Sequence, residues 1–321
     1  VTPQEDNENV RWGEAEFVAQ EEMARLTGYW WSPQDRRIAV ERFDESEVGV
    51  VTRAAIGATG TRVYDQRYPV AGSANALVEL FVMDPGGGNR VKVDLGEETD
   101  IYLARVDWAP DGSALYVQRQ NRDQTVLDML RVDPATGASE VLFTENAAVE
   151  DYWINLSDNY QWLDDGSLIW WSERDGFGHL YRYADGEWTQ LTQGDWMVTK
   201  LVGVDQQAGR VYFQGTMDDV LAQQVYGFDL DDPAAIERLT DPAFVNSASM
   251  DSKAQTLLVS RSKPDQPTQS YIADTSGQRL TWIEENALDG QHPYAPFLAG
   301  HRAPEFGTIE AEDGTELDWK M

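Results

Sequence analysis

The chain alternates between short apolar or aromatic runs and short polar turns, and one unit of this pattern recurs along most of its length. Each unit opens with an aromatic or apolar residue, passes through a turn rich in Asp, Gly or Pro, and continues as an alternating strand. The five units open at Trp30, Trp108, Trp162, Val204 and Met250. Asp-Gly and similar pairs supply the positive φ of a tight turn, so each unit predicts a β-hairpin.

A second hairpin follows most of the first ones. In the third unit, for example, Leu180–Tyr183 turns at Asp185-Gly186 into Trp188–Thr192. Two hairpins make four strands, and the anchor positions 108, 162, 204 and 250 are 54, 42 and 46 residues apart. Four strands at that period form one propeller blade. The pattern therefore predicts an all-β fold, a β-propeller with four-stranded blades that is partial in this chain, with about five to six blades. We expect the repeated tryptophans to pack in the core between blades.

Two segments depart from the repeat. The interval from Trp31 to Trp108 is 77 residues, too long for one blade, and its polar stretch between Glu45 and Gly72 predicts an insertion or elaborated loop. Before the first unit, Glu16–Leu26 is rich in Ala, Gln, Glu, Met, Arg and Leu, which favours a short helix that Gly28 can end. This helix carries two adjacent acids, Glu21 and Glu22.

Composition supports a folded β-rich domain and limits its partners. The 321 residues are 41% hydrophobic and 11% aromatic, with a formal net charge of −31. Such a charge repels nucleic acid and anionic lipid. It fits solubility, adaptation to a salty habitat, or attraction of cationic ligands such as peptide N-termini. With no Cys, the chain has no disulfide and no thiolate nucleophile. No apolar run approaches 18 residues, so we expect no membrane span.

Catalytic and cofactor motifs are missing from the sequence. No Gly-x-Ser-x-Gly elbow occurs, and the three histidines do not suggest a triad base: His179 falls at a hairpin turn, while His292 and His301 flank a proline-rich segment. No metal-binding motif and no phosphate-binding glycine loop is present. We therefore expect no catalytic residue, no metal and no cofactor in this chain.

The adjacent acids Glu21 and Glu22 allow two interpretations. Neighbours on a helix point about 100° apart, so the two carboxylates do not pair as acid and base across a bond. They can converge on a primary ammonium, which has three hydrogen-bond donors. Spacing alone favours the other interpretation, an exposed acidic helix face, and on the residues alone both stay open.

A resemblance to a known family bears on this choice. Phe17–Glu22 followed by Gly28–Pro33 is similar to the double-glutamate segment of dipeptidyl peptidase IV and its bacterial relatives, in the prolyl oligopeptidase superfamily. Arg67–Asn75 and Tyr152–Asn155 resemble other stretches of that family, and Phe306–Thr315 resembles its bridge from propeller to hydrolase. The similarity runs from about Trp12 to the end of the chain.

The resemblance implies a function. The family places an eight-bladed propeller over an α/β-hydrolase, and its double glutamate holds the free amine of a peptide, so that dipeptides ending in Pro or Ala are released. Carried over, Glu21 and Glu22 would bind the amine, and Trp153 and Asn155 would lie near the substrate-facing rim. Family members are usually homodimers, partly through propeller extensions. A periplasmic or secreted location also follows from the resemblance.

The same resemblance defines what we expect to lie elsewhere in the parent protein. Residues 1–305 would be part of the substrate-gating propeller, and residues 306–321 would start the bridge to a C-terminal α/β-hydrolase domain. The catalytic serine, aspartate and histidine, an upstream arginine and the first blades would lie outside this sequence. This chain alone would not be an enzyme, whereas its parent would be a serine dipeptidyl peptidase. The alternatives are a non-catalytic protein-interaction propeller and a propeller glycosidase, for which no pattern selects the acids.

Overall fold

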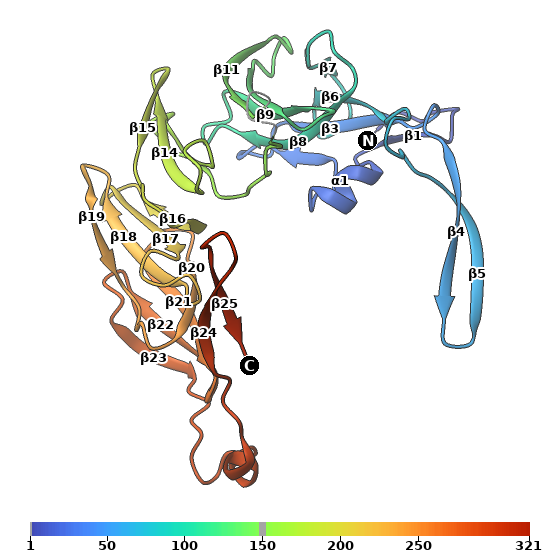
Figure 1. Ribbon diagram of the computed structural model, residues 1–321. Helices are drawn as coiled ribbons and strands as arrows, with labels where there is room; N and C mark the ends of the chain where they lie inside the picture. The colour runs from blue at the N-terminus through green and yellow to red at the C-terminus, as the bar shows by residue number, and fades with distance from the viewer. Residues whose placement is uncertain (1, 148–151) are drawn as a thin grey trace. The chain divides into compact units, whose positions relative to one another are not determined.

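The computed structural model describes residues 2–147 and 152–321. The chain divides into two compact units, Val1–Asp158 with Trp162–Ser167, and Asn159–Gln161 with Leu168–Met321. Each unit is built from antiparallel sheets of the predicted kind (Figure 1). In the described residues, five sheets have the strand composition of propeller blades, which confirms the all-β, four-stranded-blade prediction.

The first sheet has the order β1-β3-β6-β7, with β2 also paired to β3. Its strands are β1 (Val10–Trp12), β2 (Tyr29–Trp31), β3 (Ile38–Asp44), β6 (Leu77–Met83) and β7 (Val91–Lys92). Both β1 and β2 pair with β3, at residues 42–44 and 38–40 respectively. The two short strands therefore form one interrupted strand, and the blade has four strand positions.

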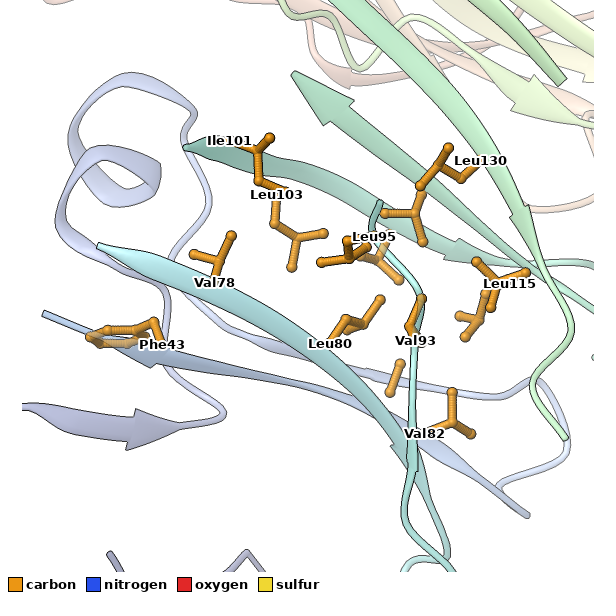
Figure 2. Packing of buried hydrophobic residues seen from close by; sticks show 14 residues of the cluster. Phe43, Val78, Leu80, Val82, Val93, Leu95, Ile101, Leu103, Leu115 and Leu130 are labelled. Atoms are coloured by element: carbon orange, nitrogen blue, oxygen red, sulfur yellow. The ribbon is translucent and has the colours of Figure 1, made fainter. Parts of the chain in front are cut away.

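The second sheet completes the main body of the first unit. Its strands, in the order β11-β10-β9-β8, are β8 (Ile101–Trp108), β9 (Leu115–Asn121), β10 (Val126–Val132) and β11 (Ser139–Asn146). Apolar side chains from this sheet and the first one pack together in a buried cluster that includes Phe43, Leu80, Leu103 and Leu130 (Figure 2). The repeated tryptophans Trp30 and Trp108 pack against the same cluster. Sheet-to-sheet burial of this kind is the contact that holds neighbouring blades together.

Three further sheets follow along the chain. The third is β12 (Gln161–Trp162), β13 (Leu168–Ser172), β14 (His179–Ala184) and β15 (Glu187–Gln190). The fourth is β16 (Val198–Asp205), β17 (Arg210–Gly215), β18 (Gln224–Asp229) and β19 (Asp232–Arg238). The fifth is β20 (Val245–Met250), β21 (Thr256–Lys263), β22 (Gln266–Asp274) and β23 (Arg279–Glu284). In each of these three sheets the strands follow one another in chain order, as successive hairpins require.

The insertion predicted between Glu45 and Gly72 is a long hairpin. Its strands β4 (Val50–Gly57) and β5 (Gly60–Arg67) pair only with each other among the described residues, and they project from the first unit as an arm (Figure 1). Near the end of the chain, a 3₁₀ helix η2 (Ala295–Gly300) precedes a second isolated hairpin, β24 (Phe306–Glu310) with β25 (Glu316–Lys320). This hairpin lies where the bridge was expected, and the domain boundary at residue 305 stays a prediction.

Two local predictions were wrong. The helix α1 spans only Phe17–Glu22, shorter than the expected Glu16–Leu26, because Ala24 has a φ of 53° and ends the helical path before Gly28. His179 does not lie in a turn but is the first residue of β14, where it is fully buried. Its ring nitrogens contact the Thr192 hydroxyl at 3.0 Å and the Gly194 carbonyl at 2.9 Å. These contacts give His179 a structural role.

Candidate functional site

The double glutamate lies on a segment that leaves the first blade through a gap in its strand. We call residues 13–28, between β1 and β2, the excursion. Three backbone hydrogen bonds close its neck: Gly13 N–H donates to the Glu41 carbonyl at 2.9 Å, Glu41 N–H to the Gly28 carbonyl at 2.7 Å, and Gly28 N–H to the Gly13 carbonyl at 3.1 Å. An isolated bridge between Glu14 and Thr27 extends this closure by one residue pair. The excursion is therefore tied to β3 at both ends.

Glu16 starts the helix. Its buried carboxylate accepts hydrogen bonds from the N–H groups of Val18 and Ala19, at 2.5 and 2.9 Å. These are two of the amide groups that no helix can satisfy internally, so the side chain acts as an N-cap. Burial raises the pKa of Glu16, while the positive charge of Arg25 and these backbone donors oppose the shift. The cap fixes the direction in which α1 begins.

One face of α1 packs on the second blade. Ala15, Ala19 and Met23 recur at intervals of four residues and are buried against Tyr102 and Ala104 of β8. With this face fixed, Glu21 and Glu22 in the last turn are exposed. Among the described residues, neither carboxylate has a hydrogen-bond or ion-pair partner, so both remain open to an incoming cation.

The positively charged Arg122 lies beside Tyr102, on which α1 packs. The Arg122 guanidinium is 5.8 Å from the centre of the Tyr102 ring, and its nitrogens lie 3.4 Å from the Ser73 carbonyl and 3.5 Å from the Asp100 carboxylate. Burial raises the pKa of Tyr102, Arg122 opposes the shift, and negative charges that include Glu22 add to it. The Tyr102 hydroxyl is thus within electrostatic reach of the helix end that carries the double glutamate.

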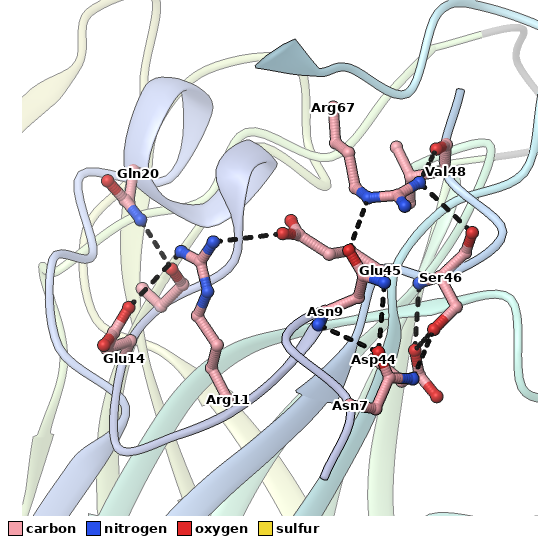
Figure 3. A network of polar contacts seen from close by, with 11 residues as sticks. Asn7, Asn9, Arg11, Glu14, Gln20, Asp44, Glu45, Ser46, Val48 and Arg67 are labelled. Atoms are coloured by element: carbon pink, nitrogen blue, oxygen red, sulfur yellow. Dashed lines mark hydrogen bonds and ion pairs between the residues drawn. The ribbon is translucent and has the colours of Figure 1, made fainter. Parts of the chain in front are cut away.

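A polar network around Arg11 of β1 holds the start of the excursion (Figure 3). Arg11 contacts Glu14 at 3.6 Å and Glu45 at 3.2 Å, which links the excursion to the end of β3. Arg67 at the root of the arm donates to Asn9 at 2.9 Å and to the Val48 carbonyl at 2.6 Å. The N-terminal segment, the excursion and the arm are therefore joined at one end of the first blade.

Trp153 and Asn155 lie in the same unit as the double glutamate. The Trp153 ring is 67% exposed, and its Nε1–H donates to Asn155 Oδ1 at 3.2 Å. Their segment is anchored by Ile154, whose N–H donates to the Gln124 carbonyl at 2.7 Å. Leu156 packs against the buried face of α1. The structure therefore brings this segment beside the helix through Leu156. The place of Trp153 and Asn155 near a substrate-facing rim, and the function of their side chains, stay predictions.

Sequence reasoning missed the residues beneath the helix. Glu41 and Arg25 form a buried ion pair, with 0% and 7% of their side chains exposed. A charged residue within the apolar strand Ile38–Phe43 was the available signal for Glu41, since such a position must have a buried partner. Nothing in the sequence identified that partner as Arg25.

The exposed Glu21 and Glu22 carboxylates decide which ligands this site suits. No group of three or more His, Cys, Asp or Glu in the described residues has metal-binding geometry. His292 contacts Asn286 at 2.9 Å, and His301 contacts Tyr294 at 2.9 Å and the Pro264 carbonyl at 3.0 Å, so both rings have polar partners. What the excursion presents is a pair of free carboxylates on a rigid support, which suits a small cation with several donors.

No helix in the described part of the chain is long and apolar enough to cross a membrane.

Comparison with known proteins gives the family. The sequence model described as "Dipeptidyl peptidase IV (DPP IV) N-terminal region" matches residues 1–268. Mouse dipeptidyl peptidase 8 is 27% identical over 313 residues, which covers 74% of this chain and 35% of that protein. A probable dipeptidyl-aminopeptidase B of Botryotinia fuckeliana is 27% identical over 308 residues, with 86% of this chain and 33% of that protein covered. The chain thus spans about a third of the length of these curated relatives.

Solved structures share the fold. The crystal structure of Porphyromonas gingivalis dipeptidyl peptidase 4 superposes with a TM-score of 0.86 at 24% identity, covering 97% of this chain and 44% of that one. A putative dipeptidyl aminopeptidase IV from Bacteroides ovatus gives a TM-score of 0.77 at 25% identity, covering 99% of this chain and 47% of that one. With the family match over residues 1–268, the chain belongs to the dipeptidyl peptidase IV N-terminal region family, whose β-propeller fold it has.

Proposed function

We propose that this chain is the substrate-gating propeller of a serine dipeptidyl peptidase and that Glu21 and Glu22 bind the free N-terminal amine of the peptide. The observation that carries the proposal is the pair of exposed, unpartnered carboxylates at the end of a helix whose other face is buried. An ammonium group can donate charge-assisted hydrogen bonds to both, each contributing about 1.5–3 kcal/mol where water is excluded. Family membership supports the proposal, because the matched relatives are named as dipeptidyl peptidases.

In this proposal the carboxylates act by positioning. An amine held at a fixed place sets which peptide bond reaches the nucleophile, so two residues are released at a time. The nucleophile would come from a C-terminal α/β-hydrolase domain of the same protein, which the bridge starting at residues 306–321 would join to the propeller. The isolated β24–β25 hairpin supports a change of structure at that point. Xaa-Pro and Xaa-Ala dipeptides are the proposed products, and Trp153 and Asn155 are proposed to border the bound peptide.

The arm supports a second copy of the protein as a partner. Residues 50–67 contain three arginines and one aspartate, a net charge of +2 in a chain whose total is −31. Arg53 and Arg62 lie on one face of this hairpin, as their pairing with Tyr64 and Ala55 shows, and Ile56 on the other face is 85% exposed. A cationic arm on an acidic protein is complementary to the body of an identical chain. We propose a homodimer formed through this arm.

We also propose a periplasmic or secreted location, on the resemblance alone. Fractionation of cells that express the full-length protein tests it, and recovery in the cytoplasmic fraction would contradict it.

The test of the function is dipeptide release by the full-length protein. Glu21→Gln and Glu22→Gln keep side-chain size and remove one charge each, so each variant should lower kcat/KM for a free-amine Xaa-Pro substrate by at least about tenfold, the equivalent of 1.4 kcal/mol. Glu47→Gln, at an exposed acid in the loop after β3 and outside the excursion, serves as the matched control. Full activity in both site variants would reject the amine-binding role and favour a non-catalytic interaction propeller.

A further inference from the structure

The excursion leaves the first blade between β1 and β2, and Glu41 of β3 lies opposite that gap. Trp12 pairs with Arg42 and Tyr29 pairs with Val40, so Glu41 is the β3 residue that faces the gap between the two short strands. Its backbone closes the neck of the excursion, and its side chain is fully buried. A carboxylate at this point therefore lies where β3 meets both ends of the excursion.

Arg25 reaches this carboxylate from the irregular segment that returns from α1 to β2, three residues after Glu22. Its Nη1–H donates to Glu41 Oε2, and the same nitrogen donates to the Thr27 carbonyl at 3.1 Å. The guanidinium carbon lies 5.7 Å from the centre of the Trp30 ring. The Arg25 N–H also donates to the Ala19 carbonyl at 3.0 Å, which ties the residue to the helix itself. Arg25 therefore connects α1 to the blade, with its backbone bonded to the helix and its side chain to β3.

The ion pair is poorly suited to a purely stabilising role. Arg25 Nε and Nη2 and Glu41 Oε1 are buried without a hydrogen-bond partner among the described residues. Burying two charges costs several kcal/mol each, on the order of what their attraction returns, and well-packed apolar residues often serve stability as well or better. What apolar residues cannot supply is a directional bond between two defined atoms. The pair thus fits a function in fixing position.

We propose that Arg25 and Glu41 are positioning residues, whose buried ion pair sets the place and orientation of the α1 end and so aligns the Glu21 and Glu22 carboxylates on one cation. This inference rests on the proposed amine-binding function. Neither residue touches the ligand: both act through the helix. A shift of about 1 Å in such a positioning element can cost about 100-fold in catalytic efficiency.

The test is a double-mutant cycle in the full-length protein at about pH 8. Arg25→Met, Glu41→Leu and the double variant are compared for thermal midpoint and for KM with a free-amine Xaa-Pro substrate. Each single variant leaves a buried charge unpaired, so both Tm and affinity should fall. In the double variant Tm should recover to near the wild-type value, whereas KM should stay about tenfold or more above it, because the apolar pair restores packing without the directional bond.

Recovery of both Tm and KM in the double variant would overturn the inference, since a purely structural pair behaves in that way. An unchanged KM in the single variants would overturn it too. In either case a loss of activity in Glu21→Gln would leave the amine-binding function standing. Full activity in both Glu21→Gln and Glu22→Gln would instead remove the proposed function, and the inference with it.

Two measurements guard against indirect effects. Arg42→Met removes a neighbouring β3 arginine that contacts Glu79 at 2.7 Å on the more exposed side of the strand, and it should leave KM unchanged. Hydrogen exchange of the Gln20, Met23 and Arg25 amides, which donate within the excursion, reports its order without catalysis. These amides should exchange faster in the double variant than in the Arg42→Met control, and equal rates would contradict the inference.

Discussion

Gly28 lies directly against the Glu14 backbone at the neck of the excursion. A Cβ on residue 28 would overlap with the Glu14 carbonyl oxygen and would lie 3.0 Å from the Glu41 Cβ. The two ends of the excursion can approach this closely only because residue 28 has no side chain. The position of α1 thus depends on a glycine that the sequence suggested only as a helix end.

Gly28→Ala should therefore lower the stability of the fold. We expect a loss of about 1–3 kcal/mol in the free energy of unfolding, the typical cost of overpacking, because the neck must open to admit the methyl group. Denaturant unfolding measures the change. Gly49→Ala is the matched control, since a Cβ there meets nothing within 4 Å, and a loss of the same size at both positions would contradict the close-approach argument.

The buried Glu41 should make stability depend on pH. Burial raises its pKa from 4.5 to about 7, against the opposing effect of the Arg25 charge. The folded state then holds the proton more tightly than the unfolded state, so this contribution to stability is fully present below pH 4.5 and is lost as the pH rises through about 7. Unfolding followed from about pH 5 to about pH 8 should show a falling stability in the wild type.

Glu41→Gln should reduce that slope, because the amide does not titrate. The slope need not vanish, since burial also raises the pKa of Glu16 and its contribution has the same sign. Glu79→Gln, which removes a partly exposed acid on β6, should keep the wild-type slope. Identical slopes in wild type and Glu41→Gln would contradict this explanation.

The arm should control association. Arg53→Glu with Arg62→Glu reverses the charge of one arm face, and we expect the dimer dissociation constant to rise about tenfold or more at low salt because like charges then meet. Sedimentation of the full-length protein measures the constant. Arg90→Glu, a single exposed charge reversal in the β6–β7 turn, is the control, compared with each single arm variant. A dimer unaffected by the double reversal would show that the arm is not the interface.

The exposed tryptophan near the helix should contribute contact area to the bound peptide. Trp153→Ala should raise KM by a few fold, about 1 kcal/mol, with little change in kcat, because the ring contacts the ground state and the transition state alike. Tyr152→Ala, also exposed in the same segment, shows whether the effect is specific to residue 153. Equal effects of both substitutions would argue against a defined contact at Trp153.

The sequence predicts the blades well because their determinants are local. Asp-Gly turns such as Asp185-Gly186, with a φ of 53° and 82°, need no distant partner to form. The long interval after Trp31 likewise predicted an insertion, although its polar composition gave no indication of the paired strands β4 and β5.

The site could be predicted only in part, because its geometry depends on contacts between distant residues. Helix propensity extended α1 to Leu26, whereas Arg25 turns away to reach Glu41, 16 residues further along the chain. The sequence identified the acids Glu21 and Glu22 themselves. Their exposure, however, follows from the packing of the opposite helix face on Tyr102 of β8. His179 was misplaced for the same reason, since its partner Thr192 follows the neighbouring strand β15, 13 residues along the chain.

The most direct test of the central claim is amine discrimination, measured as the ratio of kcat/KM for a free-amine Xaa-Pro substrate to that for its N-acetylated form in the full-length protein. The ratio cancels losses of folded protein, so it reports the amine site alone. If Glu21 and Glu22 bind the amine, the ratio should be large in the wild type and should fall about 100-fold or more in Glu21→Gln/Glu22→Gln. A ratio near the wild-type value in the double variant would show that the amine is recognised elsewhere.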